Sequence, residues 1–440
     1  MYQDRMLIKY GLAAMIGILM GFKILPPVFT GILFGGLMLA FIIYAFNNKI
    51  EDALLILPFI VFGEIFFRGH ARAYLPYLSV QYMYIIGFGI LLAKNKLQKK
   101  NFHFPPIAML LAFFVLEILN GFLAEKQIVT RGIQTNSLAL LLPALWASFY
   151  KFSPSFINKL LDNVRIATVF LAGIVLVAHL QGKIDYGNAS NSDASSNMAP
   201  VQLSAYLGLG SILFLISVLN PFDKRSKIIQ LIFLVIISTL MVLTFSRGGL
   251  YFLGVVALIY LFFNRTNLGS YFKFLIFLPI GLIIYNFVVV ETGGKIVDRY
   301  NAQGASNREE LVRIGFLIYL EHPVIGIGTG NYNTYIKRNK LFALESGAHN
   351  EFVRVAAEHG TIGIVIFWGF FLALLRHILI RPKPSKDYGV YFLVLFALIT
   401  VHNGLKVSVQ PFLLILAIAI APIGASTKQM TNVSAKQHRA

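Results

Sequence analysis

The sequence contains no cysteine and few charged residues. Because none of its 440 residues is a cysteine, the chain has no disulfide framework and no thiolate-based metal or redox chemistry. Charged residues make up only 13% of the chain, whereas soluble domains contain about 25%. Hydrophobic residues make up 57%. This balance argues against an ordinary soluble protein and indicates a chain that lies mostly within a membrane.

Apolar runs of about 18–20 residues recur along the whole chain, and each can cross a hydrocarbon core of about 30 Å. The sequence therefore predicts an all-α polytopic membrane protein with about 12–14 transmembrane helices, packed as a single integral membrane domain over residues 1–440. The first run begins near Met6 without a small-residue cleavage site after it, so we expect a retained span. The candidate runs are 7–24, 27–46, 52–67, 76–93, 105–124, 134–150, 165–181, 201–219, 228–246, 248–263, 272–290, 352–375, 388–403 and 407–424.

The formal net charge of +19 could indicate a nucleic-acid partner or a topology signal. We favour the topology signal, and expect no nucleic acid, because Lys and Arg collect in short loops between the apolar runs. Placing these loops in the cytoplasm lets the spans alternate without conflict, with both termini cytoplasmic. The basic segments are 94–100, 222–227, 376–386 and the tail after Ser426. The opposite, outer side then carries 68–75, 125–133, 182–200, 291–348 and 402–406.

The outer segment 291–348 is the only long loop, and long structured loops usually carry function. Ser306 and Glu309 match a capping box, and apolar residues follow at helical spacing, which predicts a short amphipathic helix over about 307–321. Pro323 ends that helix, which should lie against the membrane or the bundle. The glycine-rich turn 326–330 is not a nucleotide-binding loop, since no strand precedes it and no Lys-Ser/Thr pair follows it.

A histidine and an asparagine, His349 and Asn350, stand where this loop becomes a membrane helix. Glu351, Arg354 and Glu358 follow on one helix face. Polar groups are costly beside a bilayer, and histidine is the usual general base near neutral pH. A helix cap is the plainer explanation of His349, but the surrounding polar cluster and the long loop favour a catalytic base.

Several cationic residues are predicted on the same outer side. Arg247 interrupts two apolar runs where positive charge is disfavoured, so binding of an anionic ligand would explain it. Arg308 and Arg313 on the loop helix suit phosphate oxygens, although an exposed helix face paired with Glu309 and Glu310 is the alternative. Together these groups form a surface suited to a diphosphate. The further outer candidates are Arg68, Arg72, His402 and Lys406.

Two intramembrane carboxylates, Glu64 and Glu117, leave a second function open. They could relay protons in a transporter or flippase of lipid-linked glycans, or they could be paired within the bundle. Transporter sites lie near the membrane midplane, often in paired halves, whereas the polar residues here gather on the outer side. No Asp-rich or His-x-x-x-His arrangement indicates a metal.

The ordered motifs resemble the O-antigen ligase and O-antigen polymerase superfamily of bacterial envelope glycosyltransferases. The resemblance is strongest over residues 246–363. It is carried by Ser246-Arg247-Gly248, by Arg308 through His322-Pro323, by Gly326-Ile327-Gly328-Thr329-Gly330-Asn331, and by His349-Asn350 followed by Gly360-Thr361-Ile362-Gly363.

The resemblance implies a GT-C-like, multi-pass enzyme of the bacterial inner membrane with its active site facing the periplasm. Its donor would be a glycan on undecaprenyl diphosphate, and its acceptor a hydroxyl of the lipid A core or of another glycan. His349 would be the base, and Arg247 with Arg308 or Arg313 would stabilise the leaving diphosphate, with Asn350, Arg68, Arg72, His402 and Lys406 as further substrate-binding candidates. The reaction would be inverting and need neither a cofactor nor a metal. Ligase and polymerase remain alternatives.

Overall fold

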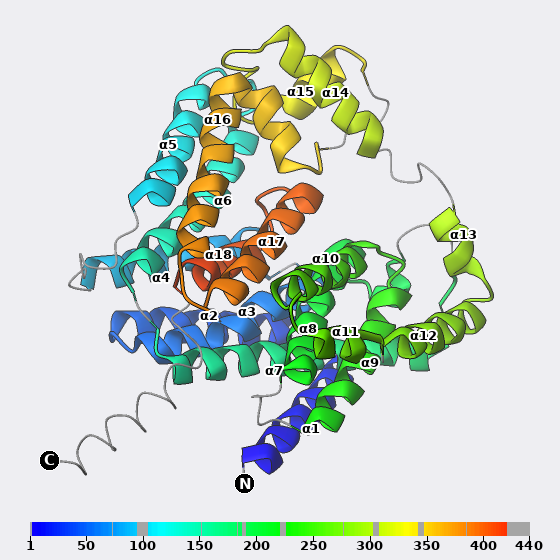
Figure 1. The fold of residues 1–440 in the computed structure, drawn as a ribbon. Coiled ribbons are helices and arrows are strands. Elements are labelled where there is room, and N and C mark those ends of the chain that lie inside the picture. Colours follow the sequence, from blue (N-terminus) through cyan, green and yellow to red (C-terminus); the bar gives the residue numbers. More distant parts are fainter. Residues whose placement is uncertain are drawn as a thin grey trace, which may run out of the picture.

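In the computed structural model, all regular secondary structure within the described residues is helical (Figure 1). Its helices confirm the predicted all-α polytopic membrane protein. Of the described helical segments, five are long and apolar enough to cross a membrane, and five more are shorter and apolar. The described residues are 2–72, 74–94, 104–150, 152–182, 184–186, 191–220, 226–275, 277–301, 308–341, 347–383 and 385–419.

Each predicted apolar run coincides with one helix or with two consecutive helices. The run predicted over 272–290 is the divided one. The helices are α1 Tyr2–Gly21, α2 Pro27–Phe46, α3 Ile50–His70, α4 Ser79–Lys94, α5 Phe104–Gly121, α6 Gln127–Phe149, α7 Pro154–Leu180, α8 Pro200–Leu219, α9 Lys227–Leu243, α10 Gly248–Phe263, the pair α11 Leu268–Leu275 and α12 Phe277–Glu291, α16 Glu351–Leu379, α17 Ser385–Asn403 and α18 Val409–Ala419.

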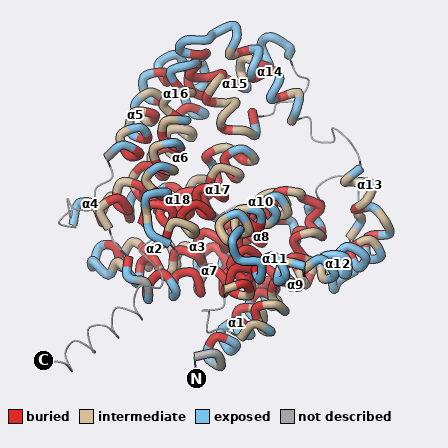
Figure 2. The backbone as a smooth tube through the Cα atoms, viewed as in Figure 1, coloured by how far each residue is buried: buried red, intermediate tan, exposed pale blue. Residues whose placement is uncertain are grey.

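Burial separates central helices from peripheral ones. Nearly every residue of α8 and all of α18 are buried, whereas α12 buries only Val288 (Figure 2). The first helix joins the bundle through small residues, because a Cβ atom on Gly17 would stand 2.2 Å from the carbonyl oxygen of Phe170 in α7. Such close backbone approach is how membrane helices pack without a hydrophobic driving force between them.

Hydrogen bonds sort the interhelical segments into two groups at opposite ends of the bundle. At one end Arg68 contacts Gln202, and the amide of Gln81 contacts the carbonyl oxygen of Lys406. At the other end Lys94 contacts the carbonyl oxygen of Phe46. For the segments that these three bonds join, the arrangement agrees with the predicted topology, while the compartment that each end faces stays a prediction. Most of 94–100 and 222–227, and the tail after Ser426, lie outside the described residues.

Short helices cap the first of these ends, hereafter the site end. They are α13 Lys295–Asn301, α14 Arg308–Glu321 and α15 Tyr332–Arg338. Figure 1 shows α14 and α15 beyond the ends of α5 and α16. The helix α14 corresponds to the helix predicted over 307–321, but Ser306 and Asn307 of the predicted capping box lie outside the described residues.

The glycine-rich turn 326–330 packs against a kink in α16. Gly360 interrupts that helix with φ 60° and ψ −153°, so the span predicted as continuous over 352–375 is bent. The amides of Ile327 and Gly328 donate to the carbonyl oxygens of Ala357 and Glu358, each at 3.0 Å. These bonds satisfy carbonyl groups that the kink releases from the helix. The turn therefore has a structural role.

Replacing Gly326 by alanine should destabilise this turn. Gly326 has φ +69°, and an added Cβ atom would stand 2.3 Å from the carbonyl carbon of Glu358. The left-handed backbone alone costs a non-glycine residue about 1–2 kcal/mol, and the clash adds to it. We expect a lower midpoint of heat-induced aggregation in fluorescence-detected size-exclusion chromatography.

The matched control is Gly132→Ala in α6, where nothing lies within 4 Å of the added atom. Alanine is favoured over glycine in helices by about 1 kcal/mol, so its midpoint should be unchanged or slightly higher. Equal midpoints for the two variants would contradict the structural role given to Gly326.

Candidate active site

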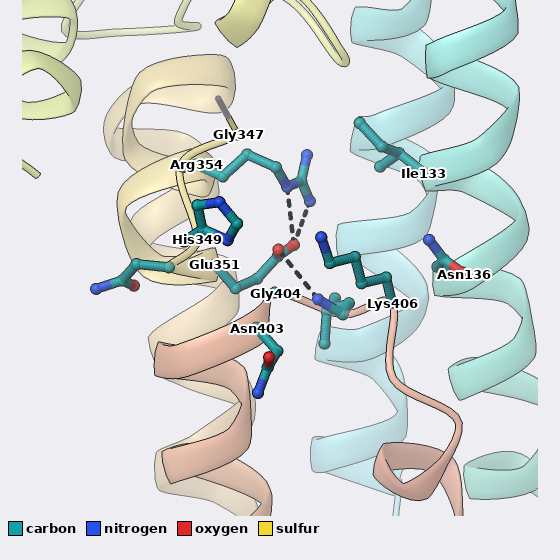
Figure 3. A pocket seen from close by; sticks show the side chains of 12 residues that line it. Ile133, Asn136, Gly347, His349, Glu351, Arg354, Asn403, Gly404 and Lys406 are labelled. Carbon is teal, nitrogen blue, oxygen red and sulfur yellow. Dashed lines mark hydrogen bonds and ion pairs between the residues drawn. The ribbon is translucent and has the colours of Figure 1, made fainter. Parts of the chain in front are cut away.

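A small open pocket of about 140 Å³ lies where the start of α16 meets the α17–α18 turn. His349, Glu351 and Arg354 line it from the α16 side, and Lys406 lines it from the turn. Figure 3 shows Glu351 between His349 and Lys406, with α6 on the far side of the pocket. Residues more than 50 positions apart in the sequence therefore meet here.

The backbone directs His349 out of the helix that follows it. His349 has φ +48°, in the left-handed region that non-glycine residues seldom adopt. Asn350 is the N-cap of α16, and its Oδ1 accepts hydrogen bonds from the amides of Phe352 at 3.0 Å and Val353 at 3.4 Å. The cap is thus made by Asn350, which had been predicted to bind substrate, and His349 is left beside the pocket.

One guanidinium group, that of Arg354, contacts three carboxylates. Its Nη2 is 2.7 Å from Glu117 Oε1, its Nη1 is 2.5 Å from Glu358 Oε2, and its Nε is 2.9 Å from Glu351 Oε1. The three carboxylate side chains are at most 4% exposed, and Arg354 is 11% exposed. We call these four residues the Arg354 cluster. A buried carboxylate is tolerable only when it is paired in this way.

The Arg354 cluster connects α16 to three other parts of the chain. Glu117 belongs to α5. Glu358 Oε1 accepts from the amide of Tyr332 at the start of α15, at 3.2 Å. Glu351 Oε2 accepts from the amide of Leu405 in the α17–α18 turn, also at 3.2 Å. Because Leu405 adjoins Lys406, the cluster determines where that lysine stands relative to His349.

A second group of cations lies beside the pocket. The Nη1 atom of Arg308 contacts Nδ1 of His402, whose ring stacks on Tyr251 with 6.3 Å between centroids. Arg247 donates from Nη2 to the carbonyl oxygen of Arg299 at 2.7 Å, and its guanidinium stands 5.4 Å from the ring centroid of Tyr300. The segment that contains α13 is thereby held against the start of α10.

Like charges are crowded along this side of the site. Partial burial and the charge of Arg247 lower the pKa of Arg299, and partial burial with the charge of Arg299 lowers the pKa of Arg308. Removal from water and the charge of Arg68 lower the pKa of Lys406. We define the cationic row as Arg247, Arg299, Arg308, Lys406 and Arg68. An anion among these groups would relieve their mutual repulsion.

The imidazole of His349 lies within the influence of this row. Partial removal of the ring from water lowers its pKa, and the nearby charges of Lys406 and Arg308 lower it further. The ring is therefore neutral at neutral pH and can accept a proton. A neutral base beside a row of cations suits a reaction in which a hydroxyl loses a proton while an anion departs.

Two polar atoms near Arg247 are buried without a hydrogen-bond partner among the described residues. They are Nε of Arg247 and the hydroxyl oxygen of Tyr300. A buried donor without a partner costs about 1–3 kcal/mol. Both groups could donate hydrogen bonds to an anion.

The structure separates the predicted site residues into two groups. The first group comprises His349, Asn350 and Lys406, which line the pocket, Arg247, Arg308 and Arg68, which belong with Lys406 to the cationic row, and His402, which contacts Arg308. Arg313 instead extends from α14 into solvent and pairs with Glu310, with Nη2 and Oε1 2.6 Å apart. This is the ion pair that the sequence had left as an alternative. Arg72 is exposed in the turn after α3.

Sequence reasoning missed Arg299 and the linking role of Arg354. Arg299 lies in a segment without a recognisable motif, so only its contact with Arg247 reveals it. Arg354 was placed on one face with Glu351 and Glu358, but its partner Glu117 is 237 residues away. No pattern in a single sequence connects positions so far apart.

The two intramembrane carboxylates are both paired. Arg68 donates to Glu64 at 3.0 Å, and Ser408 also contacts that carboxylate. Glu117 is bonded to Arg354, as described above. Within the part of the chain that the structure describes, no group of three or more His, Cys, Asp or Glu side chains is arranged so that it could hold a metal ion.

Together, the fold and the site define a multi-pass membrane protein with a cationic, histidine-containing pocket at one end of its bundle. Residues 232–368 match the family described as O-antigen ligase, which confirms the predicted resemblance to the O-antigen ligase and polymerase superfamily. The match overlaps the region predicted over 246–363 and includes Arg247, Arg308 and His349. No curated protein matches the chain.

Removing the guanidinium of the Arg354 cluster should destabilise the fold strongly. Arg354→Met leaves three buried carboxylates without their cation, and breaking a buried pair in this way costs about 3–5 kcal/mol. We expect the helical circular dichroism signal to be lost at lower denaturant in mixed micelles. The control is Arg338→Met, which removes an exposed pair with Glu125, worth about 0–1 kcal/mol. If both variants unfold at the same denaturant concentration, the Arg354 cluster does not stabilise the site.

Proposed function

We propose that this protein transfers a glycan from an undecaprenyl diphosphate carrier to a hydroxyl of an acceptor sugar. The observation that carries the proposal is the position of His349, a neutral imidazole flanked by Lys406 and Arg308 at one end of a membrane bundle. The family match over residues 232–368 supports an O-antigen ligase or polymerase type of activity.

The cationic row would hold the diphosphate of the donor. Arginine binds phosphate oxygens with two parallel N–H groups, and Arg247 and Arg308 offer such groups close to the membrane edge. At that depth the polyprenyl chain can remain in the lipid while its diphosphate reaches the row. The guanidinium groups take the place of a metal ion in this proposal, so the reaction is metal-independent.

The proposed step is a single displacement at the anomeric carbon. His349 accepts the proton of the acceptor hydroxyl, and the hydroxyl oxygen forms a bond with that carbon. The bond from the carbon to the diphosphate oxygen breaks, and the carrier diphosphate departs with the electron pair. The cationic row stabilises the charge that develops on it. Attack opposite the leaving group inverts the anomeric configuration.

The placement proposed for this reaction is the periplasmic face of the bacterial inner membrane. The acceptor would be the lipid A core for a ligase, or the next repeat unit for a polymerase. A transporter receives less support, because Glu64 and Glu117 are both ion-paired and the cations gather at one end of the bundle instead of its middle.

Substitutions in the site should abolish transfer by the purified, reconstituted protein. We expect His349→Ala to lower the rate by about 10²–10⁴-fold, as loss of a general base does. Arg247→Ala should lower it by about 10²–10³-fold through lost stabilisation of the leaving group. The measurement follows transfer from a lipid-diphosphate-linked glycan to either lipid A core or a second lipid-linked repeat, and the productive acceptor separates ligase from polymerase.

The control for these variants is Arg338→Ala, which lies on the surface away from the pocket and should retain the native rate. Each variant is first shown to elute as a single species, so that a lost rate is not a lost fold. Transfer at the native rate by His349→Ala would remove the base from the proposed mechanism.

The pH dependence of transfer should report the ionisation of His349. Its pKa lies below the ordinary value near 6.5, so kcat/KM should be constant around pH 7–8 and fall as the pH decreases through that lowered value. Lys406→Met removes a positive neighbour, raises the pKa of His349 and should move the acidic limb to higher pH. Lys406→Arg keeps the charge and should leave the limb in place. A limb that stays unchanged in Lys406→Met would show that another group controls it.

A further inference from the structure

The helix α14 exposes apolar side chains on the face that does not pack on the protein. Leu311, Ile314 and Ile318 are buried in a small cluster with α15 and α16. On the other face Phe316 and Leu320 are each 57% exposed. A helix of an ordinary surface cap would present polar groups there.

Two neighbouring turns extend this apolar surface. In the turn after α14, Val324 is 62% exposed and Ile325 is 49% exposed. The turn between α5 and α6 exposes Phe122 and, at the start of α6, Ile128, each by more than 80%. The two turns are joined by a 2.9 Å hydrogen bond from Nδ2 of Asn120 to the carbonyl oxygen of Ile325. We define the apolar rim as Phe122, Ile128, Phe316, Leu320, Val324 and Ile325.

Backbone hydrogen bonds join the part of the rim after α14 to one position along α16. The amide of Thr361 donates to the carbonyl oxygen of Pro323 at 2.8 Å, and the amide of Ile362 donates to that of Val324 at 3.4 Å. From Thr361 to Leu379 the helix extends for about 28 Å at 1.5 Å per residue. This length matches a hydrocarbon core of about 30 Å, so Thr361 stands at its boundary.

The rim is continuous with a surface that must face lipid. Below Thr361, α16 exposes a stripe made of Ile362, Val365, Trp368 and Leu372, the last three at least 50% exposed. In a multi-pass membrane protein such a stripe on a spanning helix contacts acyl chains. Because Val324 is hydrogen-bonded to Ile362 at the top of the stripe, the same lipid meets the rim.

We propose that the apolar rim inserts into the lipid leaflet at the site end and anchors the cap in the membrane surface. The partner is the bilayer itself, which binds amphipathic helices through their apolar side chains at the headgroup boundary. The anchor has a consequence for the site, because α14 begins at Arg308 in the cationic row. The membrane would thus set the depth of the C-terminal end of α14, a helix of 14 residues, while Arg308 stands at its N-terminal end. This inference does not depend on the proposed glycan transfer.

Tryptophan fluorescence in reconstituted vesicles tests the proposal. The chain has two tryptophans, of which Trp146 is 1% exposed and supplies a constant baseline, while Trp368 is 50% exposed. In a Trp368→Phe background, Phe316→Trp or Val324→Trp places the probe on the rim. We expect phosphatidylcholine that carries a shallow spin label to quench the fluorescence of these rim tryptophans several-tenfold more efficiently than aqueous iodide does. The native Trp368 should respond best to a deep label.

The matched control is Asn333→Trp in the same background, since Asn333 is exposed on α15 outside the rim. Its fluorescence should be quenched by iodide and not by labelled lipid. Rim probes that behave like Asn333→Trp would overturn the proposal. Rim probes shielded from both quenchers would overturn it too, because a second copy of the chain or another protein would then cover the rim. Two rim positions are used so that one poorly folded variant does not decide the result.

Discussion

The bonding of three buried carboxylates to the single guanidinium of Arg354 is the interaction on which the site depends. It joins α5 to α16, and through the amides of Tyr332 and Leu405 it also holds α15 and the α17–α18 turn. Each carboxylate would be costly without the cation. Because the pocket lies between the parts that this cluster joins, the cluster determines the distance between His349 and Lys406.

The Arg354 cluster has more carboxylates than cations, whereas the cationic row beside the pocket has an excess of positive charge. Partial burial and the charge of Arg247 lower the pKa of Arg299, and partial burial and the charge of Arg299 lower that of Arg308. Partial burial and the charges of Lys406 and Arg308 lower the pKa of His349. A protein keeps like charges together only where something offsets their repulsion. An anionic substrate at the membrane edge would do so, and partial burial together with the nearby positive charges favours the neutral form of His349. In the proposed mechanism, this crowding of charge would serve both the binding of a diphosphate and the action of His349 as a base.

The motifs that carry the family resemblance have different roles in the structure. His349 and Asn350 both line the pocket, and Asn350 also caps α16. The glycine-rich turn lies against the kink at Gly360 and bonds to carbonyl groups of Ala357 and Glu358. It therefore supports the first turns of α16, which carry Glu351, Arg354 and Glu358 of the Arg354 cluster. Local spacing in the sequence does not distinguish a residue that lines the pocket from one that shapes the backbone.

The sequence by itself determined the helical spans, the predicted alternation of the loops and most of the residues among which the candidate site is found. These follow from hydropathy and from the placement of Lys and Arg, which are local properties of the sequence. Hydropathy decides which segments can cross a hydrocarbon core about 30 Å thick, and the positions of Lys and Arg indicate on which side each loop lies. Only the tertiary structure decided that Arg308 enters the site while Arg313 pairs with Glu310, that Arg299 joins the row, and that Glu117 meets Arg354. Those outcomes depend on how distant helices pack, because the strength of an ion pair depends on separation in space and on burial, and a sequence records neither.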